Sequence, residues 1–324
     1  MDLTIALERY DRHFPFFDGS VKAPAGTTYR ALQVGQSYGL KDGIDRHGNM
    51  LHKKAYDIAE FSMSTYLMAI DRKVPLVGIP VFPRRLFSSG LMFVRHDSAV
   101  THPRELKGKR VAIRAFQTTL SLLAKGDLKF EYEMPWEDIH WLVEEEEKIA
   151  FTPKAGVKVE RLPAGADAGY MLRDGLCDAV IQPHPPHSIM SGEVKVRRLF
   201  ADPDAEEARY FKKYGYWPIM HIVVMWRDLA DKHPWLPAAL MEMWGQAKTI
   251  SRDYYSDPNW SQLAFGRRYY EREIERFGTD DLFPMGLAVN RGNIEQFIKY
   301  SRDQELIKGA FGVDDLFHES VRGT

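Results

Sequence analysis

The segment from Tyr170 to His187 constrains the fold more than any other stretch of the sequence. It predicts the end of a helix, a stop at Gly175 and a short buried strand, Asp178-Ala179-Val180-Ile181. A polar loop follows the strand, from Gln182 to His187, stiffened by prolines and carrying two imidazoles. In an open α/β sheet, ligands bind beyond the carboxyl ends of strands. Alone, the segment is better interpreted as a surface loop, but the same pattern recurs at several other strand ends.

Strands and helices alternate through most of the chain, which favours an α/β fold. Strands are expected at Leu3–Leu7, Ala55–Phe61, Leu76–Pro80, Gly90–Val94, Arg110–Ile113, Lys158–Arg161, Asp178–Gln182 and Ile219–Met225. Helical patterns such as Ser64–Asp71 and Thr118–Leu128 separate several of them. The last hundred residues predict helices at about 234–255, 260–277 and 293–304. We interpret their aromatic residues as core packing rather than as a pocket.

Composition excludes several classes of protein. The 324 residues carry a formal net charge of −1, so nucleic acid is not an expected partner. A single cysteine, Cys177, excludes a disulfide framework and metal sites built on thiolates. No apolar run approaches the roughly 20 residues that span a bilayer, and the first residues resemble a strand rather than a signal peptide. We therefore expect a cytoplasmic protein without membrane contact; homo-oligomer formation is left open.

Polar side chains follow most of the expected strands. The hydroxyls among them suit helix N-caps, and a helix N-terminus is also a site for anions. The arginine pair at 84 and 85 suits bidentate capture of a carboxylate. Together these groups indicate a small acidic, aromatic ligand. The candidate binding residues are Arg12, Ser62, Ser64, Phe82, Arg84, Arg85, Arg114, Phe116, Gln117, Thr118, Thr119, Gln182 and Asn290.

Two histidines and two glutamates are the candidates for acid–base chemistry. His184 lies on the proline-rich loop, where it can titrate near neutral pH. His221 lies inside an apolar strand, where an unpartnered imidazole would be costly, so it meets either a core partner or a ligand. Glu8 and Glu60 follow the first two strands and are the alternative acids.

No cofactor is expected, and a metal is the weaker hypothesis. The sequence has no glycine-rich phosphate loop and no dinucleotide-binding motif. His184 and His187 could hold a metal together with Glu8 or Glu60, but their spacing in a proline-rich loop is weak support.

The ordered motifs resemble the 4,5-dihydroxyphthalate decarboxylase family, which has the type II periplasmic-binding-protein fold. The resemblance runs through nearly the whole chain, although the segment Gln182 to His187 departs from the family pattern. It rests on Tyr10-Asp11-Arg12 with Asp18-Gly19, Tyr56 to Ser62, Ser64 to Leu67, Ile79 to Arg85, Leu106 to Val111, Phe116 to Thr119, Asp138 to Trp141, Gly175 with Asp178-Ala179, Val196 to Phe200, and Pro218 to Val224.

The resemblance implies an α/β architecture of two lobes with a ligand cleft between them. The first lobe would hold residues 1–93 and 222–324, including the C-terminal helices, and the second would hold residues 94–221. Leu91–Val94 and Ile219–Val223 would be the strands that cross between the lobes. The polar clusters at the strand ends would then line the cleft.

The resemblance also implies a decarboxylase of a hydroxylated aromatic acid, such as a 4,5-dihydroxyphthalate-like substrate. Arg85, helped by Arg84 or Arg114, would hold a spectator carboxylate. His184 and His221 would supply acid and base, with Glu8 or Glu60 in reserve. Phe116 or Phe82 would face the departing carboxylate. The alternative is a solute-binding or ligand-sensing protein for a small aromatic acid, because this fold serves mostly to bind solutes.

Overall fold

The first of the two β-sheets combines the first four strands of the chain with the last one. The computed structural model describes residues 1–324. The first sheet has the strand order β2-β1-β3-β11-β4, with β1 (Asp2–Leu7), β2 (Thr28–Gln33), β3 (Ile58–Ser62), β4 (Leu76–Arg85) and β11 (Ile219–Trp226). β1 runs parallel to β2 and β3, whereas β11 lies between β3 and β4 and is antiparallel to both. β3 and β11 are buried along their full length, as their continuous apolar runs predict.

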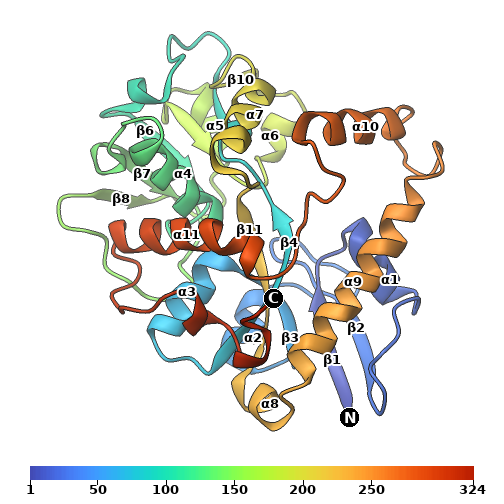
Figure 1. The fold of residues 1–324 in the computed structure, drawn as a ribbon. Coiled ribbons are helices and arrows are strands. Elements are labelled where there is room, and N and C mark those ends of the chain that lie inside the picture. The colour runs from blue at the N-terminus through green and yellow to red at the C-terminus, as the bar shows by residue number, and fades with distance from the viewer.

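The second sheet is built by the middle of the chain. Its strand order is β10-β5-β9-β6-β7-β8, with β5 (Met92–Arg95), β6 (Arg110–Ile113), β7 (His140–Val143), β8 (Lys158–Arg161), β9 (Ala179–Ile181) and β10 (Val196–Arg198). β6 to β9 pair in parallel, and β5 is antiparallel to both of its neighbours. Figure 1 shows the two sheets in separate lobes, the second above the first.

Helices cover both sheets and begin where the sequence supplies caps. α3 (Met63–Asp71) begins after Ser62, whose hydroxyl accepts the Thr65 amide, and α4 (Thr119–Phe130) begins after Thr118. The other helices are α1 (Phe14–Phe17), α2 (Arg46–Lys53), α5 (Ala168–Arg173), α6 (His187–Met190), α7 (Pro203–Tyr214), α8 (Arg227–Lys232), α9 (Leu236–Tyr254), α10 (Gly266–Phe277) and α11 (Arg291–Asp303). None of them combines the length and the apolar composition that crossing a membrane requires.

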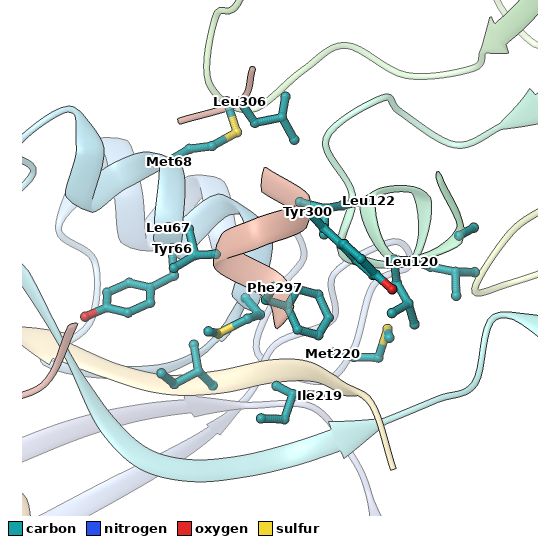
Figure 2. Packing of buried hydrophobic residues seen from close by; sticks show 14 of the residues in the cluster. Tyr66, Leu67, Met68, Leu120, Leu122, Ile219, Met220, Phe297, Tyr300 and Leu306 are labelled. Carbon is teal, nitrogen blue, oxygen red and sulfur yellow. The ribbon is translucent and has the colours of Figure 1, made fainter. Parts of the chain in front are cut away.

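α11 packs against both lobes at once. Figure 1 shows it lying across the middle of the molecule, and it contacts α3 of the first lobe and α4 of the second. Phe297 and Tyr300 belong to a cluster of 49 buried apolar residues that includes parts of both sheets. In Figure 2 these two rings lie between side chains of α3, such as Leu67, and side chains of α4, such as Leu120. The two lobes therefore share one core.

A buried carboxylate adds a polar junction to this shared core. Asp127 of α4 accepts hydrogen bonds from the hydroxyls of Ser88 (2.6 Å), Tyr210 of α7 (3.3 Å) and Tyr300 of α11 (3.1 Å). Burial raises the pKa of Asp127 to about 7. The junction ties the segment between the lobes to helices from both.

The expected two-lobed α/β fold is confirmed, but the lobe boundaries need a correction. The predicted boundaries 93/94 and 221/222 fall inside β5 and β11. Strand pairing places β5 wholly in the second sheet and β11 wholly in the first. The chain therefore passes between sheets at 86–91 and again at 199–218. The C-terminal helices also do not belong to the first lobe alone, because α11 packs on α4.

Candidate active site

A small polar cleft lies where β3, β4 and β11 of the first lobe meet α4 and the 182–187 loop of the second. Strand register places His221 opposite Ser62 of β3 and Arg84 of β4. The hollow is narrow, about 70 Å³, so it admits only a small molecule. It is lined by Gln36, Ser37, His47, Ser62, Thr65, Arg84, Arg114, Ala115, Gln117, Thr118, Thr119, Leu120, Glu145, Glu146, Lys148, Pro183, His184, Met220 and His221.

The centre of the site is a carboxylate–imidazole pair. Glu60 of β3 bonds the Nδ1 atom of His221 of β11 through its Oε1 atom. Nδ1 carries the proton in this arrangement, because the carboxylate can only accept. The Nε2 atom of His221 has no hydrogen-bond partner in the protein, and the ring lines the cleft. The free nitrogen is therefore available to a ligand as a proton acceptor.

A buried arginine fixes the position and charge of Glu60. Arg46, at the start of α2, is fully buried and donates from Nε to the Glu60 backbone carbonyl at 2.9 Å. Its Nη2 atom lies 3.6 Å from Glu60 Oε2, and its Nη1 atom lies 3.2 Å from Glu8 Oε2. Burial by itself would raise the pKa of Glu60, but Arg46 and His221 hold it well below the usual range. Glu60 is therefore a carboxylate at neutral pH.

All three imidazoles of the cleft are neutral at neutral pH. Burial lowers the pKa of His221 to about 4 and outweighs the opposing effect of Glu60. Burial, helped by Arg84 and Arg114, lowers the pKa of His184 to about 4. His47 packs edge-on against His221 with ring centroids 5.2 Å apart, and burial and Arg46 hold its pKa well below 6.5. Before a ligand binds, the three histidines of the site are therefore proton acceptors and not proton donors.

One wall of the cleft is suited to an anion. α3 and α4 both begin there, one from each lobe, and the hydroxyls of Ser62 and Thr119 bond each other at 2.9 Å. No side chain caps the first amides of α4, so they remain available to a ligand. Arg84 donates to His184 Nε2 at 3.3 Å, and Arg114 forms an ion pair with Glu145 at 2.9 Å. Arg84 is therefore the cleft guanidinium without a carboxylate partner.

The structure brings many of the predicted residues together. The cleft is lined by Ser62, Arg84, Arg114, Gln117, Thr118, Thr119, His184 and His221. Glu60 lies directly behind His221. The Gln117 amide is engaged with the Ile149 backbone at 2.6 and 3.1 Å, so it shapes the wall more than it offers a binding group. Ser64 is fully buried next to Thr119 and has no direct face on the cleft.

The predicted carboxylate clamp at Arg85 is wrong. Arg85 is almost fully buried and donates to the carbonyls of Trp217 (2.8 Å) and Pro284 (3.0 Å) and to the side chain of Asn290 (2.6 Å). Successive side chains of a strand point to opposite faces, so only one of the arginine pair can face the cleft, and that one is Arg84. Asn290 is likewise a structural partner of Arg85 and not a ligand-binding residue.

Other predicted residues lie behind the cleft or away from it. Phe82 packs on Phe317, and Phe116 stacks on Phe151, so neither ring faces a departing carboxylate. Gln182 is buried outside the cleft wall. Arg12 donates to the Pro83 carbonyl at 2.6 Å and borders a separate cavity of about 350 Å³ near α9 and α10. Glu8 is held by Arg46 and by Tyr38 (3.3 Å), which makes it part of the scaffold around Glu60.

Residues 36–47 also contribute to the cleft, which was not expected from the sequence. Arg46 and His47 stand at the start of α2, which was not expected as a helix. Gln36, Ser37 and the distant Lys148 also line the cleft. A signal did exist, because Asp45 caps α2 by accepting the Gly48 amide and is followed at once by two basic residues. The pairing of Arg46 with two glutamates on other strands had no sequence signal.

Solved structures with the same architecture define the class of this protein as a two-lobed, type II periplasmic-binding-protein-like fold. The periplasmic aliphatic sulphonate binding protein SsuA from Escherichia coli superposes with a TM-score of 0.59 at 13% identity, covering 100% of this chain and 99% of that chain. The desulfurization enzyme DSZB superposes with a TM-score of 0.53 at 12% identity, covering 99% and 98%. At these identities the likeness concerns the fold alone.

Curated relatives confirm the expected resemblance to the 4,5-dihydroxyphthalate decarboxylase family, and no family model matches the chain. The 4,5-dihydroxyphthalate decarboxylase of Comamonas testosteroni is 29% identical over 328 residues, 98% of this chain and 96% of that protein. The protein of the same name from Pseudomonas putida is 29% identical over 223 residues, 67% of this chain and 83% of that protein. Both names confirm the prediction of a carboxy-lyase.

Proposed function

We propose that the protein decarboxylates a hydroxylated aromatic acid, with a 4,5-dihydroxyphthalate-like diacid as substrate and a protocatechuate-like acid and CO₂ as products. The names of both relatives support the reaction and the substrate class. One observation carries the proposal: His221, oriented by Glu60, presents a free nitrogen to a small cleft that also contains Arg84 and the open end of α4. A proton acceptor and an anion site thus share one hollow.

The retained carboxylate binds to Arg84 and the first amides of α4. Arg84 has no carboxylate partner of its own, and a guanidinium pairs with a carboxylate in bidentate geometry. The positive end of the α4 dipole adds to this attraction. The ring then lies in the narrow part of the cleft, next to His47 and His221.

His221 removes the proton of the ring hydroxyl para to the departing carboxylate. The proton moves to Nε2, and the imidazolium that forms is stabilised by the Glu60 carboxylate at Nδ1. Electron density from the phenolate then flows to the para carbon. Glu60 itself is too acidic to serve as the general acid, because its pKa is held well below its usual value. This assigns Glu60 the role of orienting and stabilising His221.

His184 supplies the proton to the ring carbon. In the free protein burial keeps the His184 ring neutral, and the charge of Arg84, which donates to its Nε2 atom, adds to this effect. A bound carboxylate draws Arg84 away and adds negative charge, and both changes raise the pKa of His184. Protonation of the para carbon gives a dienone. Its carbon–carboxylate bond breaks, CO₂ leaves, and the bonding pair restores the aromatic ring as a phenolate. The phenolate recovers its proton from His221, so one solvent proton is consumed per CO₂ released.

The test is incubation of the purified protein with a panel of hydroxylated benzoates and phthalates while CO₂ is measured. Diacids with a hydroxyl para to one of the two carboxylates should release CO₂, whereas phthalate, which lacks the hydroxyl, should bind without reacting. Binding of the hydroxylated acids without any CO₂ release would contradict the proposal and indicate a solute-binding or sensing protein. The expected cytoplasmic location stays a prediction.

A further inference from the structure

The turn that leads into α4 is held by hydrogen bonds to the segment 147–149. The Glu147 carboxylate accepts the backbone amides of Phe116 (2.6 Å) and Gln117 (3.1 Å). The Gln117 side chain is bonded in turn to both backbone groups of Ile149. This turn immediately precedes Thr118 and Thr119, which line the anion wall of the cleft.

A buried lysine holds the same turn through a backbone carbonyl. Lys125 of α4 is fully buried, and its Nζ atom donates to the Phe116 carbonyl at 2.7 Å. The Nζ atom lies 2.9 Å from the centroid of the Phe116 ring and 5.8 Å from the ring centroids of Trp136 and Trp141. No carboxylate bonds it directly, and Glu147 acts on it only through its charge. Burial lowers the pKa of Lys125 well below its usual value, because charging a buried amine that has no bonded carboxylate is costly.

The free-energy cost of burying the Lys125 amine indicates that this residue has a role other than stabilising the fold. Replacing buried charged groups by apolar residues of similar volume is often neutral or stabilising. What an apolar residue could not do is bond the Phe116 carbonyl, to which no other group of the protein donates. Either protonation state of the lysine carries an N–H for this bond. Lys125 therefore fixes the backbone two residues before Thr118.

We propose that Lys125 is a positioning residue for substrate: by holding the Phe116 carbonyl, it sets the turn 115–118 so that the first amides of α4 and Thr119 meet the retained carboxylate. This inference rests on the proposed function, because the proposed function identifies the retained carboxylate of the substrate as the ligand of the anion wall. It is distinct from catalysis, since Lys125 touches neither the cleft nor the reacting atoms.

The experiment compares Lys125→Met with Lys129→Met, the same substitution one turn further along α4. Lys129 forms ion pairs with Glu137 and Asp303 and lies far from the turn. Lys125→Met should raise the KM for a hydroxylated phthalate about tenfold, as expected when one charge-assisted hydrogen bond to the substrate is lost. It should leave kcat within a few-fold and the melting temperature nearly unchanged. Lys129→Met should leave KM unchanged.

Two further measurements separate this inference from the proposed reaction. Calorimetric titration with phthalate needs no turnover, and Lys125→Met should weaken phthalate binding by the same factor. Hydrogen exchange should show faster exchange of the Phe116 and Gln117 amides in Lys125→Met than in Lys129→Met. An unchanged KM or phthalate affinity in Lys125→Met would overturn the positioning role, even if the wild-type enzyme releases CO₂. Wild-type protein that binds phthalate but releases no CO₂ from any hydroxylated phthalate would contradict the proposed reaction and leave the positioning test intact.

Discussion

At the scale of single residues, Glu60 and His221 form the proposed acid–base centre, and each depends on the other. A neutral imidazole with one nitrogen committed to a carboxylate has only one nitrogen left for chemistry, which fixes the direction of proton transfer. Arg46 keeps Glu60 ionised although it is fully buried. The pair is thus a preorganised base, and several buried hydrogen-bond partners together offset the free-energy cost of burying its carboxylate.

Replacing His221 by Asn should abolish most of the turnover. The amide retains polarity but cannot accept and return the phenolic proton, so kcat should fall by roughly 10²–10⁴, the usual contribution of general acid–base catalysis. Glu60→Gln should lower kcat as well, because the imidazolium loses its stabilising charge. Steady-state kinetics at saturating substrate give the measurement. His96→Asn, on an exposed loop, is the matched control; normal kcat in His221→Asn would assign the base to another group.

The neighbouring arginines should respond differently to substitution by Lys. Arg84→Lys should weaken substrate binding by about 1–3 kcal/mol, because an ammonium cannot make paired contacts with a carboxylate. Arg85→Lys should instead lower the melting temperature, since it leaves the Trp217 and Pro284 carbonyls or Asn290 without a donor. Calorimetry with phthalate and thermal unfolding distinguish the two effects. Equal losses of affinity in both variants would show that Arg85 contributes to substrate binding as much as Arg84 does.

At the scale of elements, α4 and α11 meet at a glycine. A side-chain carbon at Gly126 would overlap the ring of Tyr300, which is itself fixed by its bond to Asp127. Gly126→Ala should therefore destabilise the protein by about 1–3 kcal/mol through overpacking, despite the better helix propensity of alanine. Gly292→Ala in α11 adds a carbon to open space and should stabilise by about 0.5–1 kcal/mol. Urea unfolding of both variants checks the two signs.

The sequence predicts elements better than it predicts partners. The apolar run that forms β11 and the Ser62 and Thr118 caps of α3 and α4 were readable locally. β2 was missed because none of its residues is fully buried, so its sequence contains no apolar run. The Glu60–His221 contact joins residues 161 positions apart and depends on strand register, which no local pattern specifies. For the same reason the sequence offered two arginines for the cleft and could not choose between them.

At the scale of the whole molecule, buried histidines and a buried aspartate act on stability in opposite directions. Burial lowers the pKa values of His13, His184 and His221 to about 4, below the 6.5 of an unfolded chain. As pH falls from 6.5 to 4, the unfolded state binds the additional protons and stability is lost. Asp127, with its pKa raised to about 7, binds its proton in the folded state first, so its contribution grows as pH falls from 7 towards 4.

Asp127→Asn should therefore make the protein more sensitive to acid. The substitution removes the contribution that opposes the histidines, so the free energy of unfolding should fall more steeply between pH 6.5 and 4.5 than in the wild type. Urea midpoints at several pH values measure the slope. Asp228→Asn, an exposed position, should reproduce the wild-type slope. A shallower slope in Asp127→Asn would show that Asp127 is already ionised below pH 5.

The position of α11 has a consequence for how a ligand enters. Binding proteins of this architecture close around ligands by hinge motion of their lobes. Here a hinge opening would pull Phe297 and Tyr300 out of the core that both lobes share, at about 25 cal/mol for each Å² of apolar surface exposed. Entry by movement of the rim loop 182–187 leaves that core intact. We expect the same radius of gyration in X-ray scattering with and without phthalate, and a heat-capacity change on binding set by the ligand's own apolar surface alone.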